Sequence, residues 1–308
     1  MSAQRLSTLV TEQINAQHAG LHQISVRDLV SAMNDEDRIV ASAVAAESES
    51  ITALIECVIA RLKGGGRLIY LGAGTSGRLG ILDASECVPT FNASPDLIQG
   101  HIAGGDHALR NSIEGAEDSH SAGENLIKEL SIGSNDAVIG ITASGRTPFV
   151  LGAISEAKTR KAFTGGIACN KNSELSEIAE RTIEVEVGPE IIAGSTRLKS
   201  GTATKLILNM ISTITMIRMG KVYQNLMIDV RVTNQKLRER AENILMHLTN
   251  CDRNDAQYAI ADADDEVRIA LITLLTGVSS SSAREYLIQN DLDLDKTIAN
   301  LKRNLNED

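Results

Sequence analysis

Apolar residues recur at helical spacing through much of the first sixty residues of the chain. Positions three and four residues apart are hydrophobic in Arg27–Val30 and in Val40–Ile59, which predicts helices with one face on a core. The triplet Gly64-Gly65-Gly66 then ends the pattern. We therefore expect residues 1–62 to form an N-terminal helical segment that packs on the core.

The middle of the chain alternates between short apolar runs and helical patterns. Five runs are rich in β-forming residues: Arg67–Leu71, Leu97–Ile102, Ala137–Thr142, Gly165–Cys169 and Thr182–Val187. Helical patterns separate them: Arg78–Val88, His107–Glu117, Pro148–Lys158 and Ser173–Glu180. This alternation predicts an α/β fold, with a five-stranded parallel sheet sandwiched by helices. The strands are short apolar runs, as expected when both faces of a sheet are buried.

Helical spacing returns in the last third of the chain. A long apolar stretch, Gly201–Met219, predicts a helix that is buried or that packs against a second subunit. From residue 235 onward five shorter helical patterns follow: Ala241–Thr249, Asp255–Ile260, Glu266–Leu274, Ser280–Gln289 and Leu294–Leu301. We expect a central domain over residues 63–234 and a small C-terminal helical bundle over residues 235–308.

Composition and charge narrow the possible partners. The formal net charge is -10, which argues against nucleic acid or an anionic membrane as the main partner. The four cysteines follow no CxxC spacing, which is typical of a reduced, cytoplasmic protein without a zinc site. No apolar run reaches the roughly 18 residues that span a bilayer, and the N-terminus has no signal-peptide pattern.

Three loops carry candidate chemistry at the carboxyl ends of the predicted strands, where open parallel sheets bind ligands. The first, Gly72–Arg78, follows the first strand. Its glycines let backbone N–H groups approach an anion, and Ser76 is a suitable N-cap for the next helix. A helix N-terminus favours a phosphate group. We take Gly74, Thr75 and Ser76 as substrate-binding residues.

The other two loops repeat this chemistry. Ala143–Pro148 places Ser144, Gly145 and Thr147 after the third strand, with proline at the expected first helical position. The segment Gly194–Thr202 combines hydroxyl groups with basic side chains. Its candidate substrate-binding residues are Ser195, Thr196 and Lys199. Together, the three loops describe a pocket for a small sugar phosphate.

Two readings of the first loop compete with phosphate binding. Gly72, Gly74 and Gly77 also match the spacing of a dinucleotide fingerprint. The acidic residue expected about 20 positions later is represented only by Asp96, which precedes its strand. An ordinary tight turn between strand and helix is the other alternative when this loop is taken alone.

A family resemblance covers nearly the whole chain. The run Gly72–Cys87 (Gly-Ala-Gly-Thr-Ser-Gly-Arg-Leu-Gly-Ile-Leu-Asp-Ala-Ser-Glu-Cys) resembles the signature of the N-acetylmuramic acid 6-phosphate etherases, which belong to the sugar isomerase domain superfamily. Further matches are Asn34–Asp37, Glu114–Asp118, Ala143–Pro148, Gly194–Thr202 and Gly220–Met227. The resemblance implies a flavodoxin-like sugar isomerase domain, and the C-terminal bundle resembles ubiquitin-associated folds.

The resemblance also implies a reaction. The family cleaves the D-lactyl ether at C3 of N-acetylmuramic acid 6-phosphate, giving N-acetylglucosamine 6-phosphate and D-lactate in murein recycling. Elimination of lactate and addition of water require acid–base groups but no metal and no cofactor. The two catalytic carboxylates of the family correspond to Glu86 and Glu117. The resemblance gives Glu86 as the proton donor to the leaving lactate and Glu117 as the second acid–base residue.

Helix geometry raises a question about Glu86. It lies ten residues after Ser76, so an unbroken helix would carry it about 15 Å from the phosphate. The C3 oxygen of the same sugar is nearer than that. We therefore expect a homodimer in which each active site is completed across the interface. An aldose–ketose sugar-phosphate isomerase and a non-catalytic sugar-phosphate sensor are the alternative functions.

Overall fold

The computed structural model describes residues 9–229, 232 and 234–304. By its internal contacts the chain divides into two compact units. The first unit comprises Met1–Ser85 and Ser94–Thr215, and the second comprises Glu86–Ala93 and Met216–Asp308. The domain bounds expected from the sequence, at residues 62 and 234, stay predictions.

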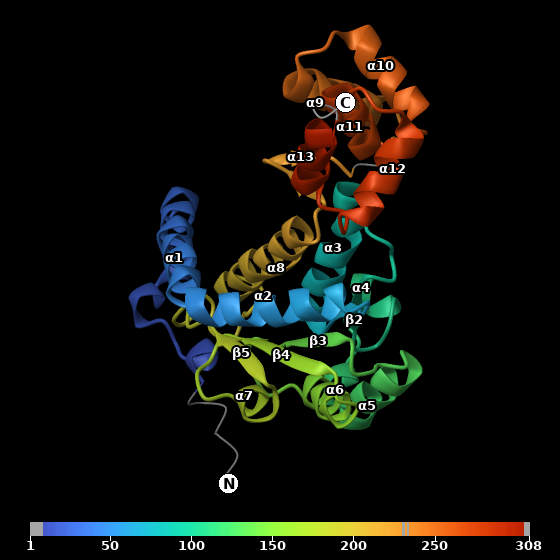
Figure 1. Ribbon diagram of the computed structural model, residues 1–308. Coiled ribbons are helices and arrows are strands. Elements are labelled where there is room, and N and C mark those ends of the chain that lie inside the picture. The colour runs from blue at the N-terminus through green and yellow to red at the C-terminus, as the bar shows by residue number, and fades with distance from the viewer. Residues whose placement is uncertain (1–8, 230–231, 233, 305–308) are drawn as a thin grey trace. The chain divides into compact units, whose positions relative to one another are not determined.

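A parallel sheet lies at the centre of the first unit (Figure 1). Its strands are β1 Leu68–Gly72, β2 Ile98–Ile102, β3 Ala137–Ile141, β4 Phe163–Ala168 and β5 Arg181–Glu184. The strand order is β2-β1-β3-β4-β5, which is the flavodoxin-like order, so the predicted fold is confirmed. Because the order reverses between β1 and β3, the loops after these two strands lie at the switch point where such sheets bind ligands.

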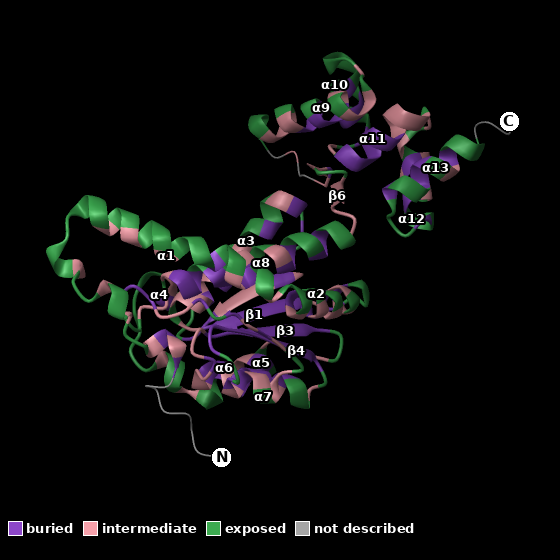
Figure 2. Cartoon of the chain, turned by 90° about the vertical axis from the view of Figure 1, so that its left-hand side faces the viewer, coloured by how far each residue is buried: buried purple, intermediate pink, exposed green. Residues whose placement is uncertain are grey.

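Helices cover both faces of this sheet. On one face lie α2 (Ser48–Lys63) and α3 (Gly74–Phe91); on the other lie α5 (His120–Glu129), α6 (Pro148–Thr159) and α7 (Glu174–Ile178) (Figure 1). Alternate residues of each strand point to opposite faces, so Ile69 and Leu71 join the core formed with α5 and α6. The central strands are wholly buried (Figure 2).

The predicted helix His107–Glu117 is wrong. Only α4 (His107–Arg110) is helical there, and a 3-10 turn, Ala116–Asp118, follows the break. Gly115 adopts the left-handed conformation at φ 72°, which interrupts a right-handed helix. The sequence pattern also missed α5, whose N-terminus is capped by Ser119 through a hydrogen bond from the backbone N–H of Ala122.

The N-terminal segment is only partly α-helical. From residue 9 onward, where the description begins, it contains 3-10 turns at Val10–Glu12, Ala16–His18 and Leu21–Gln23. Then α1 (Val26–Ala46) begins after Ser25, which accepts a hydrogen bond from the backbone N–H of Asp28. Residues 2–8 of the predicted helical pattern lie outside the described residues. Figure 2 shows that most of α1 is exposed.

The second unit is a helical bundle with a short antiparallel hairpin, β6 (Val222–Tyr223) and β7 (Leu226–Met227). Its helices are α9 Gln235–Thr249, α10 Arg253–Asp262, α11 Val267–Thr276, α12 Ser280–Gln289 and α13 Leu294–Asn304. Helix α11 is central, since its first six residues are all buried. The predicted C-terminal helices are confirmed, whereas strands of two residues were too short to predict. The resemblance to ubiquitin-associated folds stays a prediction.

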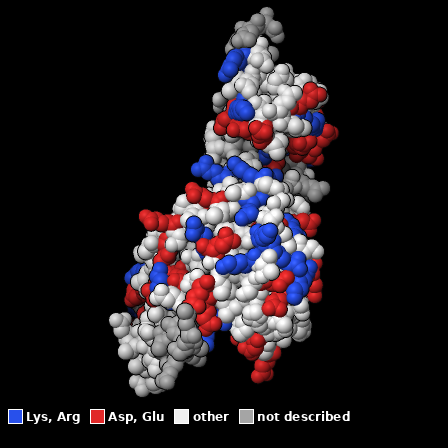
Figure 3. All heavy atoms as spheres, turned by 60° about the horizontal axis from the view of Figure 1, so that its bottom comes forward, with Lys and Arg blue, Asp and Glu red and all other residues white. Residues whose placement is uncertain are grey.

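The remaining long helix, α8 (Lys199–Arg218), passes from the first unit into the second, as α3 does. Among the described residues, no helix is both long and apolar enough to cross a membrane. Acidic and basic side chains are mixed over the face of the molecule shown in Figure 3, so this face carries no field of a single sign.

Candidate active site at the carboxyl end of the sheet

The first loop is shaped by close packing of α3 on the sheet. A Cβ atom on Gly72 would lie 2.8 Å from the backbone nitrogen of Gly77, and one on Gly77 would lie 2.6 Å from the Ile102 side chain. Two glycines of the dinucleotide-like spacing are therefore required by the approach of helix to strand. Gly74, with φ 51°, is exposed and begins α3. Ser76 lies within the first turn of that helix, so its prediction as the N-cap is wrong.

Arg78 anchors this loop to the segment that follows β2. Its guanidinium donates hydrogen bonds to the carbonyl oxygens of Leu109 (3.0 Å), Ala108 (2.8 Å) and Asn111 (3.3 Å). These contacts tie α3 to the segment after β2. The Arg78 guanidinium is thus engaged within the chain, which leaves the backbone and hydroxyl groups of the loop as its candidate phosphate contacts.

The second loop forms a ladder of hydroxyl groups. The Thr142 hydroxyl lies 3.2 Å from that of Ser144 and 2.8 Å from that of Thr147. Gly145 turns the chain at φ 75°, and Pro148 occupies the start of α6, as predicted. These contacts with Thr142 hold the hydroxyl groups of Ser144 and Thr147 at the carboxyl end of β3.

The third loop leads into α8, whose N-terminus is already capped by the chain itself. The carboxylate of Glu190, which is fully buried, accepts hydrogen bonds from the backbone N–H groups of Lys199 and Ser200, both at 3.0 Å. Sequence reasoning missed Glu190, since nothing in the spacing of Gly188-Pro189-Glu190 indicates a cap ten residues ahead. The side chain of Lys199 is buried and paired with Glu36.

The three loops lie together in the first unit. A Cβ atom on Gly201 would lie 3.6 Å from Cγ2 of Thr75, so the start of α8 rests against the first loop. The buried side chain of Asn170 donates to the Ala143 carbonyl (2.9 Å) and accepts from the backbone N–H of Val10 (2.7 Å). Asn170 thus links the N-terminal segment to the second loop.

The same segment also holds the third loop. The backbone N–H of Gly194 donates to the carbonyl of Thr11 at 3.1 Å, and Thr11 is fully buried. The described structure therefore brings together Gly74–Ser76, Ser144–Thr147 and Ser195–Lys199.

Glu86 and Glu117 differ from the loops in their surroundings. Glu86 is an exposed residue of α3 in the second unit, and Glu117 is exposed on the 3-10 turn after Gly115 in the first unit. No hydrogen bond or ion pair to another described side chain holds either carboxylate. Both are available to a ligand or to another chain.

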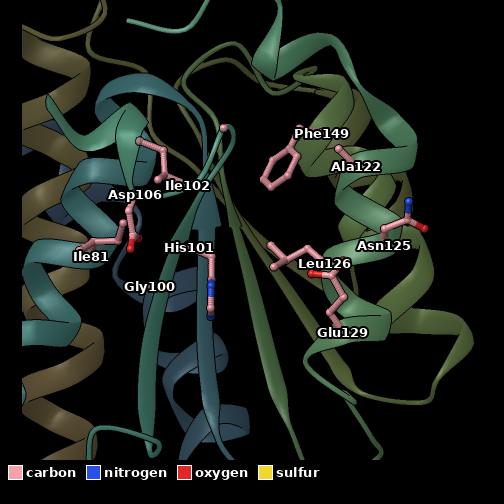
Figure 4. A pocket seen from close by; sticks show the side chains of 12 residues that line it. Ile81, Gly100, His101, Ile102, Asp106, Ala122, Asn125, Leu126, Glu129 and Phe149 are labelled. Atoms are coloured by element: carbon pink, nitrogen blue, oxygen red, sulfur yellow. The ribbon is translucent and has the colours of Figure 1, made fainter. Parts of the chain in front are cut away.

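A cleft of about 410 Å³ lies beside the edge strand β2 (Figure 4). His101 points into it from β2, across from Leu126 and Glu129 of α5. Burial lowers the pKa of His101, although Asp106 acts in the opposite direction. A neutral imidazole is therefore favoured at neutral pH.

Comparisons with known proteins give matches to parts of the chain. Residues 116–214 match the SIS domain, residues 50–158 the N-terminal SIS domain of glucokinase regulatory protein, and residues 224–268 the C-terminal lid domain of that protein. Among solved structures, a phosphoheptose isomerase from Francisella tularensis covers 62% of this chain and 98% of its own, at 16% identity and a TM-score of 0.47.

Curated relatives match over nearly the full length. N-acetylmuramic acid 6-phosphate etherase 2 of Enterococcus faecalis is 48% identical over 95% of this chain and 99% of its own. N-acetylmuramic acid 6-phosphate etherase 1 of Bacillus licheniformis is 46% identical over 97% and 98%. The Lactococcus lactis etherase is 52% identical over 86% and 90%.

Proposed function

The chain belongs to the family of N-acetylmuramic acid 6-phosphate etherases, and we propose that it cleaves the D-lactyl ether of this sugar phosphate. The products are N-acetylglucosamine 6-phosphate and D-lactate, in the recycling of murein. The observation that carries the proposal is the identity over nearly the whole chain. The three loops at the carboxyl end of the sheet support it, because they gather hydroxyl and backbone N–H groups suited to a phosphate monoester.

Binding is assigned to these loops. The first turn of α3, with Gly74, Thr75 and Ser76, offers backbone N–H groups at the positive end of a helix. Ser144, Gly145 and Thr147 add the hydroxyl ladder at the end of β3. Ser195 and Thr196 contribute hydroxyl groups from the third loop, and Lys199, whose side chain is buried against Glu36, holds the start of α8 beside them.

The chemistry proceeds from the open-chain sugar, in which C1 is an aldehyde that acidifies the hydrogen at C2. A base removes this proton, and the electron pair of the C–H bond is taken up by the aldehyde as an enolate. The double bond between C2 and C3 forms as the bond from C3 to the lactyl oxygen breaks, and this oxygen takes a proton. Water adds at C3, losing a proton to a base, while C2 regains one. Each step is a proton transfer coupled to a change at carbon.

Glu86 and Glu117 are the acid–base residues of this scheme. Glu86 donates the proton to the departing lactate oxygen, and Glu117 removes the C2 proton or activates the water. Their exposure supports this assignment, because neither carboxylate is committed to a partner side chain among the described residues. A carboxylate within hydrogen-bond reach of C2 or C3 suits either task.

The enzyme acts as a homodimer, and α1 is the first surface that supports this. Val26, Val30 and Met33 follow one stripe of the helix and are 77%, 56% and 42% exposed. An apolar stripe on an exposed helix is covered most economically by the same surface of a second copy, related by a twofold axis.

Exposed apolar residues also lie on two other helices of the first unit. Leu82 on α3 and Ile214 on α8 are both exposed, although each belongs to a helix packed on its own chain. Glu86 lies one helical turn after Leu82, on the same face of α3. An interface at Leu82 therefore directs Glu86 toward the partner subunit, and the active site is shared between the two chains.

The cytoplasm is the proposed location. None of the four cysteines forms a disulfide bond, and Cys87 and Cys169 are buried. This usage suits a reducing compartment.

Release of D-lactate from N-acetylmuramic acid 6-phosphate tests the function. Reaction in heavy-oxygen water adds a discriminating readout. The label is expected at C3 of the sugar product and not on lactate. Label on lactate contradicts the elimination scheme. Tight binding of the sugar phosphate without lactate release favours a sensor, and conversion of an aldose phosphate to a ketose phosphate favours an isomerase.

A further inference from the structure

Lys199, the first residue of α8, is an unusual charged residue in the first unit. Its side chain is 2% exposed. A buried ammonium group is costly unless it is paired and hydrogen-bonded. Its Nζ is paired with the carboxylate of Glu36, which comes from α1. The pair joins α1 to α8 through two residues that are 163 positions apart in sequence.

Glu36 is itself held by two more donors. Nε2 of His18 and Nδ2 of Asn15 each lie 2.9 Å from Oε1 of Glu36, while Lys199 engages Oε2. Burial alone would raise the pKa of Glu36, but the hydrogen bonds from Lys199, His18 and Asn15 together hold it below its ordinary value. The carboxylate therefore stays ionised opposite the lysine, with both oxygens occupied.

Lys199 is clamped at both ends. Its backbone N–H donates to Glu190, and its side chain ends at Glu36. Two residues later, Gly201 rests against Thr75 of the first loop. The orientation of the first turn of α8, and with it the position of Thr75, therefore depends on a contact made by α1.

We propose that Glu36 is a positioning residue for sugar-phosphate binding, acting through Lys199 on the junction of the first and third loops. This inference rests on the proposed function for the identity of the ligand. It gives a role to the run Asn34–Asp37, which the binding and acid–base assignments leave unused. It also gives a role to His18 and Asn15, which hold the carboxylate.

The test compares Glu36→Gln with wild type. The variant keeps the size of the side chain but removes the charge opposite Lys199. We expect KM for N-acetylmuramic acid 6-phosphate to rise about 10- to 100-fold, with kcat within about twofold, because the change affects binding and not the acid–base residues. Calorimetry with N-acetylglucosamine 6-phosphate should show the same loss of affinity.

Glu47→Gln is the matched control. Glu47 caps the end of α1 and pairs with Lys171 at 2.5 Å, but Lys171 is exposed and lies outside the three loops. This variant should keep the wild-type KM and affinity. Equal losses in both variants would mean that α1 is merely loosened, and this result would overturn the proposal. An unchanged KM and affinity in Glu36→Gln would also overturn it.

Two further measurements keep the proposal open to refutation. If Glu36→Gln fails to fold, His18→Ala removes one support of the carboxylate and leaves the Lys199 pair in place. It should raise KM about threefold at constant kcat, and an unchanged KM would refute the positioning role. If wild type releases no lactate, the proposed function fails. Binding of N-acetylglucosamine 6-phosphate by wild type and Glu36→Gln then still decides the positioning role.

Discussion

The binding loops and the two glutamates are built in opposite ways. Backbone and side-chain hydrogen bonds hold the loops from several directions, through Asn170, Glu190 and the N-terminal segment. Glu86 and Glu117 are exposed carboxylates that no described side chain holds. One chain therefore preorganises the proposed phosphate site, whereas on our proposal the two glutamates acquire their surroundings from the substrate or from a second copy.

This difference has consequences for what substitutions do. Changes in the loops should disturb folding and binding together, because the same contacts serve both. Changes at the glutamates should leave folding intact and remove turnover. The predictions below separate these two behaviours.

The largest effect is expected from Glu86→Gln and Glu117→Gln. Each removes a proton-transfer group, and general acid–base catalysis typically contributes about 10²- to 10⁴-fold to the rate. Lactate release should fall by that factor, while calorimetric affinity for N-acetylglucosamine 6-phosphate stays near wild type. The free energy of unfolding should change by less than about 0.5 kcal/mol, because both side chains are exposed.

Glu56→Gln is a suitable control for these variants, since it neutralises an exposed carboxylate on α2. It should retain full activity. Wild-type turnover in both catalytic variants would refute the assignment of the two glutamates.

A subunit-mixing experiment sharpens the comparison. Glu86→Gln chains are co-expressed with chains that carry Ser76→Ala and Ser144→Ala. If Glu86 completes the site of its partner, each mixed dimer has one intact site, and random assembly restores about a quarter of wild-type activity. If the loops and Glu86 of one chain serve the same site, every site carries a defect and mixing restores none.

Much of the fold follows from apolar patterning. The five strands were predicted within a few residues because each lies in a short run rich in β-forming residues, although only β1, β3 and β4 are wholly buried. The predicted helix His107–Glu117 was wrong. Its apolar residues do have helical spacing, but the left-handed Gly115 and the extended Asn111 break the backbone. Amphipathic α5 was missed because few of its residues are apolar.

The site was predictable only where local chemistry reveals it. Glycine and hydroxyl clusters after β1 and β3 indicated the candidate binding loops, whose role stays a prediction. Glu190 and Glu36 were not found, because their roles depend on contacts between residues distant in sequence. Among many glutamates, Glu86 and Glu117 were distinguished by family resemblance alone, and their catalytic roles stay predictions.

A loop variant should behave unlike the glutamate variants. In Gly145→Ala the new Cβ would lie 2.3 Å from Cβ of Ser173, at a backbone φ of 75°. Steric overlap and left-handed strain together should lower the free energy of unfolding by about 2–4 kcal/mol. Denaturant unfolding measures this, and ligand affinity should fall as well. Gly133→Ala is the control, because nothing lies within 4 Å of its added Cβ; equal stability of the two variants would contradict the packing argument.

The smallest effect concerns Asp83, three residues before Glu86 on α3. It accepts hydrogen bonds from Ser212 of α8 at 3.0 Å and from Tyr70 of β1, and burial raises its pKa from 3.8 to about 6. The folded state therefore binds this proton more tightly than the unfolded state. The contribution of Asp83 to the free energy of unfolding is fully present below about pH 4 and is lost as the pH rises through about 6.

Asp83→Asn removes the ionisation and keeps a hydrogen-bonding side chain of the same shape. At pH 7.5 it should stabilise the protein by about 2–3 kcal/mol relative to wild type, since one pKa unit corresponds to about 1.4 kcal/mol. This advantage should shrink toward pH 4, where the aspartate is protonated in both states. Thermal unfolding from pH 4 to 8 measures it. A pH-independent difference, or destabilisation at pH 7.5, would mean that the charged carboxylate itself supports the contact of α3 with α8. Helix α3, which carries Glu86, would then be held to α8 by electrostatic attraction, whereas the candidate binding loops are held by hydrogen bonds.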